Sequence, residues 1–162
     1  MHDADFERLI RNHERAVSTY ARSMASTPTI AEDAVQETFL RAWVYLDSFR
    51  GSGSFEGWLI RICRRCIFDL QARHQRNCEL MKRGCGPTAQ AADHTSEVYA
   101  LVDTLSLEQR EVLVLCGILG YDYETASTIL DLPIGTVRSR LHRARAALAE
   151  ALRADAGEDM SA

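Results

Sequence analysis

Apolar side chains recur every three or four residues through most of the sequence, and one polar segment interrupts this pattern. Phe6, Leu9 and Ile10 begin it, and Val98 and Leu101 resume it beyond the interruption. The interrupting residues 84–96 include two glycines and a proline but few large apolar side chains. Because the period is that of an amphipathic helix, the sequence predicts an all-α protein of two small helical domains joined by a flexible linker.

The position of this interruption sets the expected domain bounds. We expect the first domain in residues 1–80, the linker in 81–96, the second domain in 97–153 and an acidic tail in 154–162. Helices are expected at about residues 6–24, 30–46, 55–76, 123–129 and 136–152, with a helical pattern from residue 98 and another helix ending at Gly120. Thr29 with Glu32, and Ser106 with Gln109, have capping-box spacing. Ser54 and Asp122 are single N-cap candidates.

Composition argues for a cytoplasmic protein without membrane insertion. No apolar run approaches the roughly 20 residues that a membrane helix requires. The first five residues include two aspartates and no lysine or arginine, whereas a signal peptide would begin with basic residues. The five cysteines are an odd number in a chain without a secretory signal, which argues against a disulfide framework.

Positive charge is concentrated in two short stretches of an otherwise acidic chain. The formal net charge is −4, yet residues 57–83 carry 7 basic and 2 acidic side chains, and residues 133–153 carry 5 and 1. Since salt confines each charge to about 8 Å, binding of phosphates depends on such local stretches rather than on the total. Both stretches are therefore candidates for contact with nucleic acid.

The second basic stretch has the pattern of a DNA-reading helix. Val137, Leu141 and Ala144 fall on one side of the expected helix and would face a core. The side chains that project elsewhere are Arg138, Ser139, His142 and Arg143. A short helix and a turn at residues 132–134 precede it, which completes helix-turn-helix spacing. The alternative is a solvated basic face on a bundle helix.

Two separate parts of the chain resemble one family of proteins. Residues 104–113, 120–126 and 133–145, which include Gly-Thr-Val-Arg-Ser-Arg-Leu-His-Arg-Ala-Arg, resemble region four of the extracytoplasmic-function (ECF) sigma factors of bacterial RNA polymerase. Residues 31–43, 49–51 and 55–62, which include Glu-Asp-Ala-Val-Gln-Glu-Thr-Phe-Leu-Arg-Ala-Trp, resemble region two of that family. The likeness covers about residues 5–78 and 97–152 in the family's order.

This resemblance implies a function without catalysis. An alternative sigma factor of this kind binds core RNA polymerase, recognises the −35 and −10 promoter elements, and promotes the DNA opening that starts transcription. The implied partners are the core polymerase, through its beta prime clamp helices and its beta flap, and promoter DNA. An anti-sigma factor is a further partner that the resemblance allows. No catalytic residue, metal or cofactor is implied.

The resemblance also assigns roles to individual residues. The core-binding residues would be Asp33, Gln36, Glu37 and Arg41. Those that bind the −10 element would be the loop Gly51, Ser52, Gly53 and Ser54, together with Phe55, Arg61, Arg64, Arg65 and Arg73. Those that bind the −35 element would be Thr136, Arg138, Ser139, His142 and Arg143. Arg65 stands where many relatives carry asparagine, which leaves the −10 sequence preference open.

Several alternatives stay open at this point. The large aromatic residues Phe55 and Trp58 could stack on bases or simply pack in the core. Cys63, Cys66, Cys78 and Cys85, with His74 or His94 nearby, could bind zinc or sense redox state, or Cys63 and Cys66 could be small buried hydrophobes. A stand-alone transcriptional regulator, and a decoy that titrates an anti-sigma factor, are rival functions. An enzyme has no support from any motif.

Overall fold

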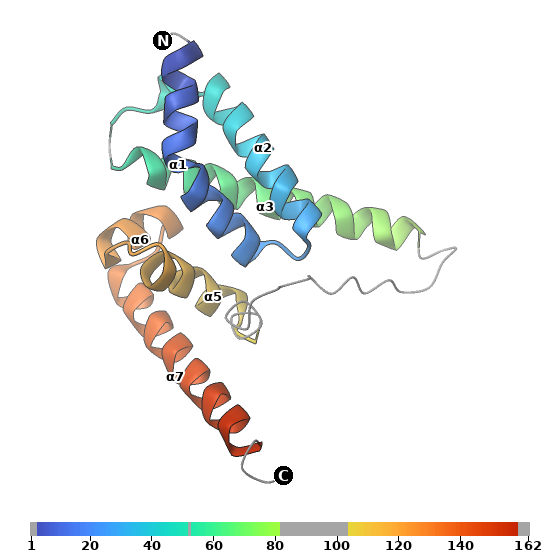
Figure 1. The fold of residues 1–162 in the computed structure, drawn as a ribbon, viewed down its shortest axis with the longest axis vertical. Coiled ribbons are helices and arrows are strands. Elements are labelled where there is room, and N and C mark those ends of the chain that lie inside the picture. Colours follow the sequence, from blue (N-terminus) through green and yellow to red (C-terminus); the bar gives the residue numbers. More distant parts are fainter. Residues whose placement is uncertain (1–2, 52, 82–103, 159–162) are drawn as a thin grey trace. The chain divides into compact units, whose positions relative to one another are not determined.

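The chain divides into two compact units, residues 1–93 and 94–162 (Figure 1). The structure, a computed structural model, describes residues 3–51, 53–81 and 104–158, and its side chains are described from residue 6 to residue 153. Within these ranges the regular elements are all helical, as the sequence predicts. No described helix combines the length and the apolar character needed to cross a membrane. Met81, which was expected to begin the linker, is instead the last residue of the third long helix; the rest of the expected linker lies outside the described residues, as do residues 98–103 of the expected helical pattern.

Three long helices form the first unit. They are α1 (Asp3–Met24), α2 (Pro28–Val44) and α3 (Phe55–Met81), with the short 3-10 helix η1 (Leu46–Ser48) between the last two. Each of the three helices packs against the other two. Val17 and Tyr20 of α1, Ala34 of α2, and Leu59 and Ile60 of α3 are fully or almost fully buried between them. These side chains supply the apolar burial that stabilises the unit.

The start of α2 differs from the expected one. A capping box was expected at Thr29 and Glu32, but the helix begins at Pro28 and its N-cap is Thr27, whose Oγ1 accepts a hydrogen bond from the Ile30 amide at 3.2 Å. Proline fits the first helical position because its ring presets the helical φ angle, and the amide hydrogen that it lacks would have no partner there. The expected box was therefore wrong by two residues.

The expected cap of α3 is confirmed. The Gly57 amide donates a hydrogen bond to Ser54 Oγ at 3.0 Å, which places Ser54 at the start of the helix. The helix then continues to Met81, five residues beyond the expected end at residue 76. Ser54 thus ties the preceding loop to the first turn of α3.

Cys63 and Cys66 lie fully buried on the face of α3 that packs against α2. Burial raises the pKa of the Cys63 thiol to about 12 and also raises the pKa of Cys66. A buried thiol of high pKa stays protonated and is a poor nucleophile and metal ligand. Both cysteines therefore behave as small core residues, whereas Cys85 and His94 lie outside the described residues.

The second unit is a helix-turn-helix built on a long last helix. It contains α5 (Leu107–Leu113), the π-helical turn η2 (Val114–Ile118), α6 (Tyr123–Leu130) and α7 (Ile134–Glu158). The Ser106 capping box is confirmed, because Gln109 N donates to Ser106 Oγ and Ser106 N donates to Gln109 Oε1. Asp122 caps α6 as expected by accepting from the Thr125 amide at 2.7 Å.

The turn between α6 and α7 is tighter than the sequence suggests. Asp131 adopts the left-handed conformation with φ of 55°, and the Pro133 carbonyl accepts hydrogen bonds from the Thr136 and Val137 amides. The helix α7 consequently begins at Ile134, two residues before the expected start. Its side facing the core is the expected one, since Val137 and Leu141 are buried.

We predict that Ser106→Ala will weaken α5. Loss of an N-cap hydroxyl costs about 1 kcal/mol of helix stability, because one helix amide loses its acceptor. Amide hydrogen exchange of the full chain should show about fivefold faster exchange in α5, while Ser106→Thr, which keeps the hydroxyl, should exchange like the parent. Equal exchange in all three proteins would contradict the role of this cap.

We also predict that Cys63 is protected from alkylation in the folded protein. Alkylation requires the thiolate, and the raised pKa together with full burial keeps Cys63 protonated and out of reach at pH 8. Mass spectrometry after iodoacetamide treatment should show modification of the half-buried Cys78 long before that of Cys63. The denatured chain is the control, in which both cysteines should react alike; equal labelling of the native protein would refute the burial of Cys63.

Candidate partner and nucleic-acid interfaces

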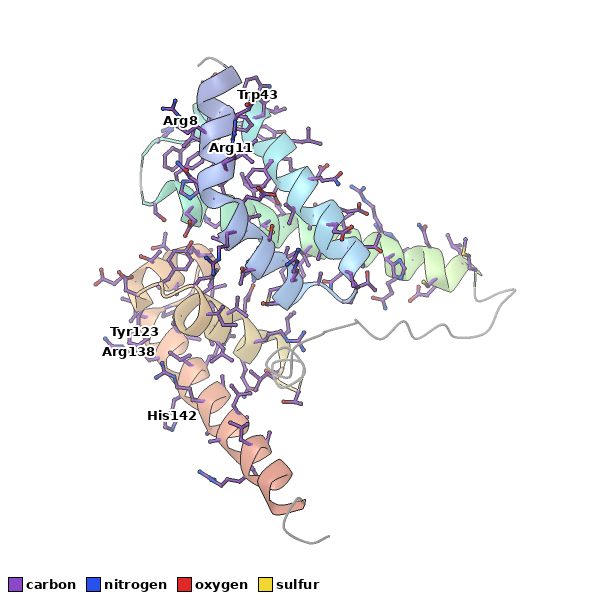
Figure 2. All side chains as sticks on the ribbon, viewed as in Figure 1. Arg8, Arg11, Trp43, Tyr123, Arg138 and His142 are labelled. Atoms are coloured by element: carbon purple, nitrogen blue, oxygen red, sulfur yellow. The ribbon has the colours of Figure 1, made fainter. Side chains whose placement is uncertain are left out.

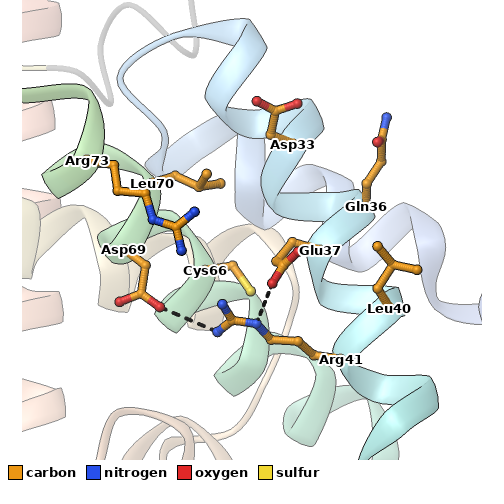
Figure 3. A pocket seen from close by; sticks show the side chains of 9 residues that line it. All are labelled: Asp33, Gln36, Glu37, Leu40, Arg41, Cys66, Asp69, Leu70 and Arg73. Atoms are coloured by element: carbon orange, nitrogen blue, oxygen red, sulfur yellow. Dashed lines mark hydrogen bonds and ion pairs between the residues drawn. The ribbon is translucent and has the colours of Figure 1, made fainter. Parts of the chain in front are cut away.

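The candidate docking face lies on the solvent side of α2. Asp33 and Gln36 are exposed, and Glu37 is half-buried beside them (Figure 3). Spacings of three and four residues place these three side chains on one face of the helix. The opposite face of α2 is buried against the rest of the unit through Ala34, Thr38 and other small residues. The carboxylates and the amide are thus left to accept hydrogen bonds from a partner.

Arg41, the fourth expected docking residue, is engaged within the unit. Its Nε donates to Glu37 Oε1 at 2.7 Å, and its Nη1 lies 3.4 Å from Asp69 Oδ2 of α3 (Figure 3). The hydrogen bond that Arg41 donates to Glu37 is the largest contribution to the raised pKa of Arg41. From the sequence, Arg41 was expected to bind core polymerase beside the other three residues. In the structure it connects that face to α3.

A hollow between α2 and α3 gathers the docking residues with one of the expected DNA-binding arginines. Arg73 lines it together with Asp33, Glu37, Arg41 and Asp69. Along α3, Arg73 is twelve residues beyond Arg61, which turns it by about a third of a circle away from that side chain. Figure 3 shows Arg73 beside Asp69 and Arg41. The structure therefore separates Arg73 from the other arginines expected to bind the −10 element.

Two exposed apolar residues on the docking face were not singled out from the sequence. Leu40 is 65% exposed and Val44 is 69% exposed, whereas Trp43 is 44% exposed and makes an edge contact with Phe6 at 4.7 Å between ring centroids. Leu40 follows Gln36 by four residues and Val44 follows Leu40 by four, so they extend the face of Asp33 and Gln36. This spacing was the signal that could have identified them.

The expected −10 loop leads into an aromatic cluster. Gly51 and Gly53 have φ angles of 72° and 91°, which side chains other than that of glycine rarely adopt. Ser52 lies outside the described residues. Phe55 packs between Phe49 and Trp58 at centroid distances of 5.2 and 5.4 Å. The half-buried Phe55 and Trp58 thus stabilise the end of the loop by packing on each other.

The other three arginines that were expected to bind the −10 element, Arg61, Arg64 and Arg65, share one side of α3. Arg61 and Arg65 are exposed, and the half-buried Arg64 lies with its guanidinium carbon 5.1 Å from the centre of the Phe68 ring. Since Arg61 and Arg65 are four residues apart, they are neighbours along this side. Together the three form a cationic surface that follows the glycine loop along α3.

The solvent side of α7 presents the expected donors. Arg138, Ser139, His142 and Arg143 are exposed, and Thr136 is half-buried. The guanidinium carbon of Arg138 lies 5.5 Å from the centre of the Tyr123 ring of α6 (Figure 2). By contrast, Arg140 forms an ion pair with Glu108 at 3.0 Å, which connects α7 to α5 within the unit.

Comparison with known proteins identifies both units. The family description "Sigma-70 region 2" matches residues 9–77, and "Sigma-70, region 4" matches residues 95–148. The chain is 34% identical to the ECF RNA polymerase sigma factor EcfG of Rhodopseudomonas palustris, with 89% of this chain and 83% of that relative covered. It is 36% identical to the ECF sigma factor SigC of Mycobacterium tuberculosis, with 80% and 71% covered.

Solved structures show the same fold. The sigma factor RpoE of Bartonella quintana, solved in complex with the anti-sigma factor NepR, has a TM-score of 0.79 and 30% identity, with 93% of this chain and 98% of that chain covered. CnrH, solved with the cytosolic domain of CnrY, has a TM-score of 0.73 and 32% identity, with 95% and 91% covered.

These matches, together with the helix-turn-helix of the second unit, establish what the protein does. It is an alternative sigma factor that directs promoter recognition in transcription initiation, it binds core RNA polymerase and promoter DNA, and it is not an enzyme. The two matched regions span most of the chain in the order found in the family. The chain therefore belongs to the ECF family of RNA polymerase sigma factors.

Proposed function

We propose that the exposed face of α2 docks on the beta prime clamp helices of core polymerase. The observation that carries this proposal is the clustering of Asp33, Gln36 and Glu37 on one accessible face beside exposed Leu40. Carboxylates accept charge-assisted hydrogen bonds from arginine and lysine across an interface. Burial of an apolar neighbour such as Leu40 removes its surface from water and so favours binding. A second contact, between the C-terminal unit and the beta flap, belongs to the same proposal.

The glycine loop and α3 contact the −10 element in this proposal. Gly51 and Gly53 carry no side chain that would keep a base or phosphate away from the backbone amides. Arg61, Arg64 and Arg65 supply positive charge along the adjoining side of α3 for a single DNA strand. Phe55 and Trp58 contribute mainly by packing on each other at the end of the loop. Arg73 contributes its positive charge from the hollow between α2 and α3, which the docking residues also line.

The exposed side of α7 reads the −35 element in the same proposal. Arg138, Ser139, His142 and Arg143 present donors on the side of the helix opposite buried Val137. A helix of this width fits the major groove, where an arginine can donate two hydrogen bonds to guanine. Thr136, at the beginning of the helix, is placed to contact the sugar-phosphate backbone.

DNA opening then requires no catalytic group. Single-stranded bases of the −10 element bind to the first unit, whereas the closed duplex does not present them. Preferential binding of the open form shifts the equilibrium from closed to open promoter by the difference in affinity. The work of the protein is thus differential binding while the core polymerase supplies the chemistry.

Regulation by an anti-sigma factor is part of the proposal. Two similar structures, RpoE and CnrH, were each solved with a regulatory partner, NepR and the cytosolic domain of CnrY. The fold that they share with this chain extends over more than nine tenths of it.

We further place the protein in the cytoplasm, because a sigma factor acts where bacterial core polymerase transcribes. Promoter-dependent run-off transcription with purified core polymerase tests the whole proposal.

We predict that Arg138→Ala with Arg143→Ala will abolish transcription from a promoter that depends on its −35 element. Each good arginine-guanine pair contributes about 1–3 kcal/mol of discrimination, so losing both removes the advantage of the specific site. Run-off transcription measures the loss, and binding to core polymerase should be unchanged. Arg153→Ala, an exposed arginine farther along α7, is the control. An equal loss of core binding would contradict the assignment to the −35 element.

We predict that Asp33→Ala with Gln36→Ala will weaken binding to core polymerase by about tenfold or more. Deleting acceptors from a docking face leaves donors of the partner without partners when the interface is desolvated. Fluorescence titration of labelled protein with core polymerase gives the Kd. The control is Asp47→Ala, which removes an exposed carboxylate away from this face. Unchanged affinity of the double variant would place the docking surface elsewhere.

A further inference from the structure

Arg41 occupies a position between the two surfaces of the first unit. It extends from the edge of the docking face toward α3, where Asp69 stands 28 residues farther along the chain (Figure 3). Its side chain is 27% exposed, less than the 41% of Glu37 and the 47% of Asp69. Of these three side chains, that of Arg41 is therefore the least exposed. A partner reaches the carboxylates of Glu37 and Asp69 more easily.

The guanidinium fork suits a bridging role. Nε and Nη1 are separate donors with fixed directions, and here one points to Glu37 while the other points to Asp69. The contact with Glu37 is short, at 2.7 Å, and the contact with Asp69 is longer, at 3.4 Å. Arg41 is thus held mainly by Glu37 and is oriented toward α3 by Asp69.

We propose that Arg41 is a positioning residue of the docking face rather than a contact with the polymerase. It holds the Glu37 carboxylate in one orientation, and Asp69 fixes Arg41 in turn on the helix that bears the promoter-binding arginines. This inference rests on the proposed docking of α2 and assigns Arg41 and Asp69 a role in it.

Ordering of a flexible side chain explains why such a bridge matters. A free glutamate samples many rotamers, and immobilising it on binding costs conformational entropy. Arg41 reduces that cost by restricting Glu37 before the partner arrives. Glu37 still keeps acceptor capacity for a donor of the partner, because a carboxylate offers about four lone-pair sites and Arg41 uses one.

A double-mutant cycle separates positioning from direct contact. If Arg41 acts only through Glu37, then Arg41→Met will weaken core binding in the parent protein but not in a Glu37→Ala background. If Arg41 touches the polymerase itself, the loss will be the same in both backgrounds. General destabilisation of the fold would also appear in both, so the dependence on Glu37 is the informative measurement.

We expect Arg41→Met to raise the Kd for core polymerase about three- to fivefold, the effect of one partly exposed ion pair. In the Glu37→Ala background the same change should alter the Kd by less than about 1.5-fold. Asp69→Asn, which weakens the anchor on α3, should raise the Kd about twofold. An equal loss in both backgrounds, or an unchanged Kd for Arg41→Met alone, would overturn the proposal.

The chain offers a matched control for this experiment. Arg11 and Glu7 form the same type of pair, four residues apart, on α1 at 3.1 Å, and both are well exposed. Arg11→Met removes an equivalent arginine from a pair elsewhere in the unit and should leave the Kd unchanged. Unchanged core binding by the Asp33→Ala, Gln36→Ala double variant would instead reject the docking role of α2, which distinguishes the two hypotheses.

Discussion

The close packing of α2 on α3 is the constraint on which the first unit depends. Small side chains of α2, such as Ala34, Thr38 and Ala42, are buried, and Thr38 interacts with the buried Cys63 and Cys66 of α3. Small residues let two helices approach closely, and close-packed interiors resist displacement. The packing of α2 on α3 therefore fixes the position of the outer face of α2 relative to the arginine side of α3.

The charged side chains on the surface are grouped according to the partner that we propose for each group. The acidic and amide groups of α2 lie where a protein partner is proposed, whereas arginines lie along α3 and α7 where DNA is proposed. Two other arginines form ion pairs within their own units, Arg140 with Glu108 and Arg41 with Glu37. A chain of net charge −4 can thus present cationic surfaces to DNA, because phosphate contacts are local.

Helix starts were predictable where one hydroxyl or carboxylate marks them. Ser54, Ser106 and Asp122 cap the helices that the sequence suggested, because a cap depends on residues only two or three positions away. The start of α1 lies three residues before the expected one, and the starts of α2 and α7, which both involve proline, lie two residues before it. Both prolines look like interruptions in a sequence. Pro28 instead occupies the first helical position of α2, and Pro133 directly precedes α7 and accepts hydrogen bonds from its first turn.

The sequence alone determined the helical class, the two units, and which side of each helix is apolar or charged, because positions within a helix are related by its own period of 3.6 residues. The tertiary structure decided which side chains meet across helices. It paired Arg41 with Asp69, and it placed Arg73 in the hollow that Asp33 and Glu37 also line. The physical reason is that the angle and register of α2 on α3 bring together residues that no local spacing relates.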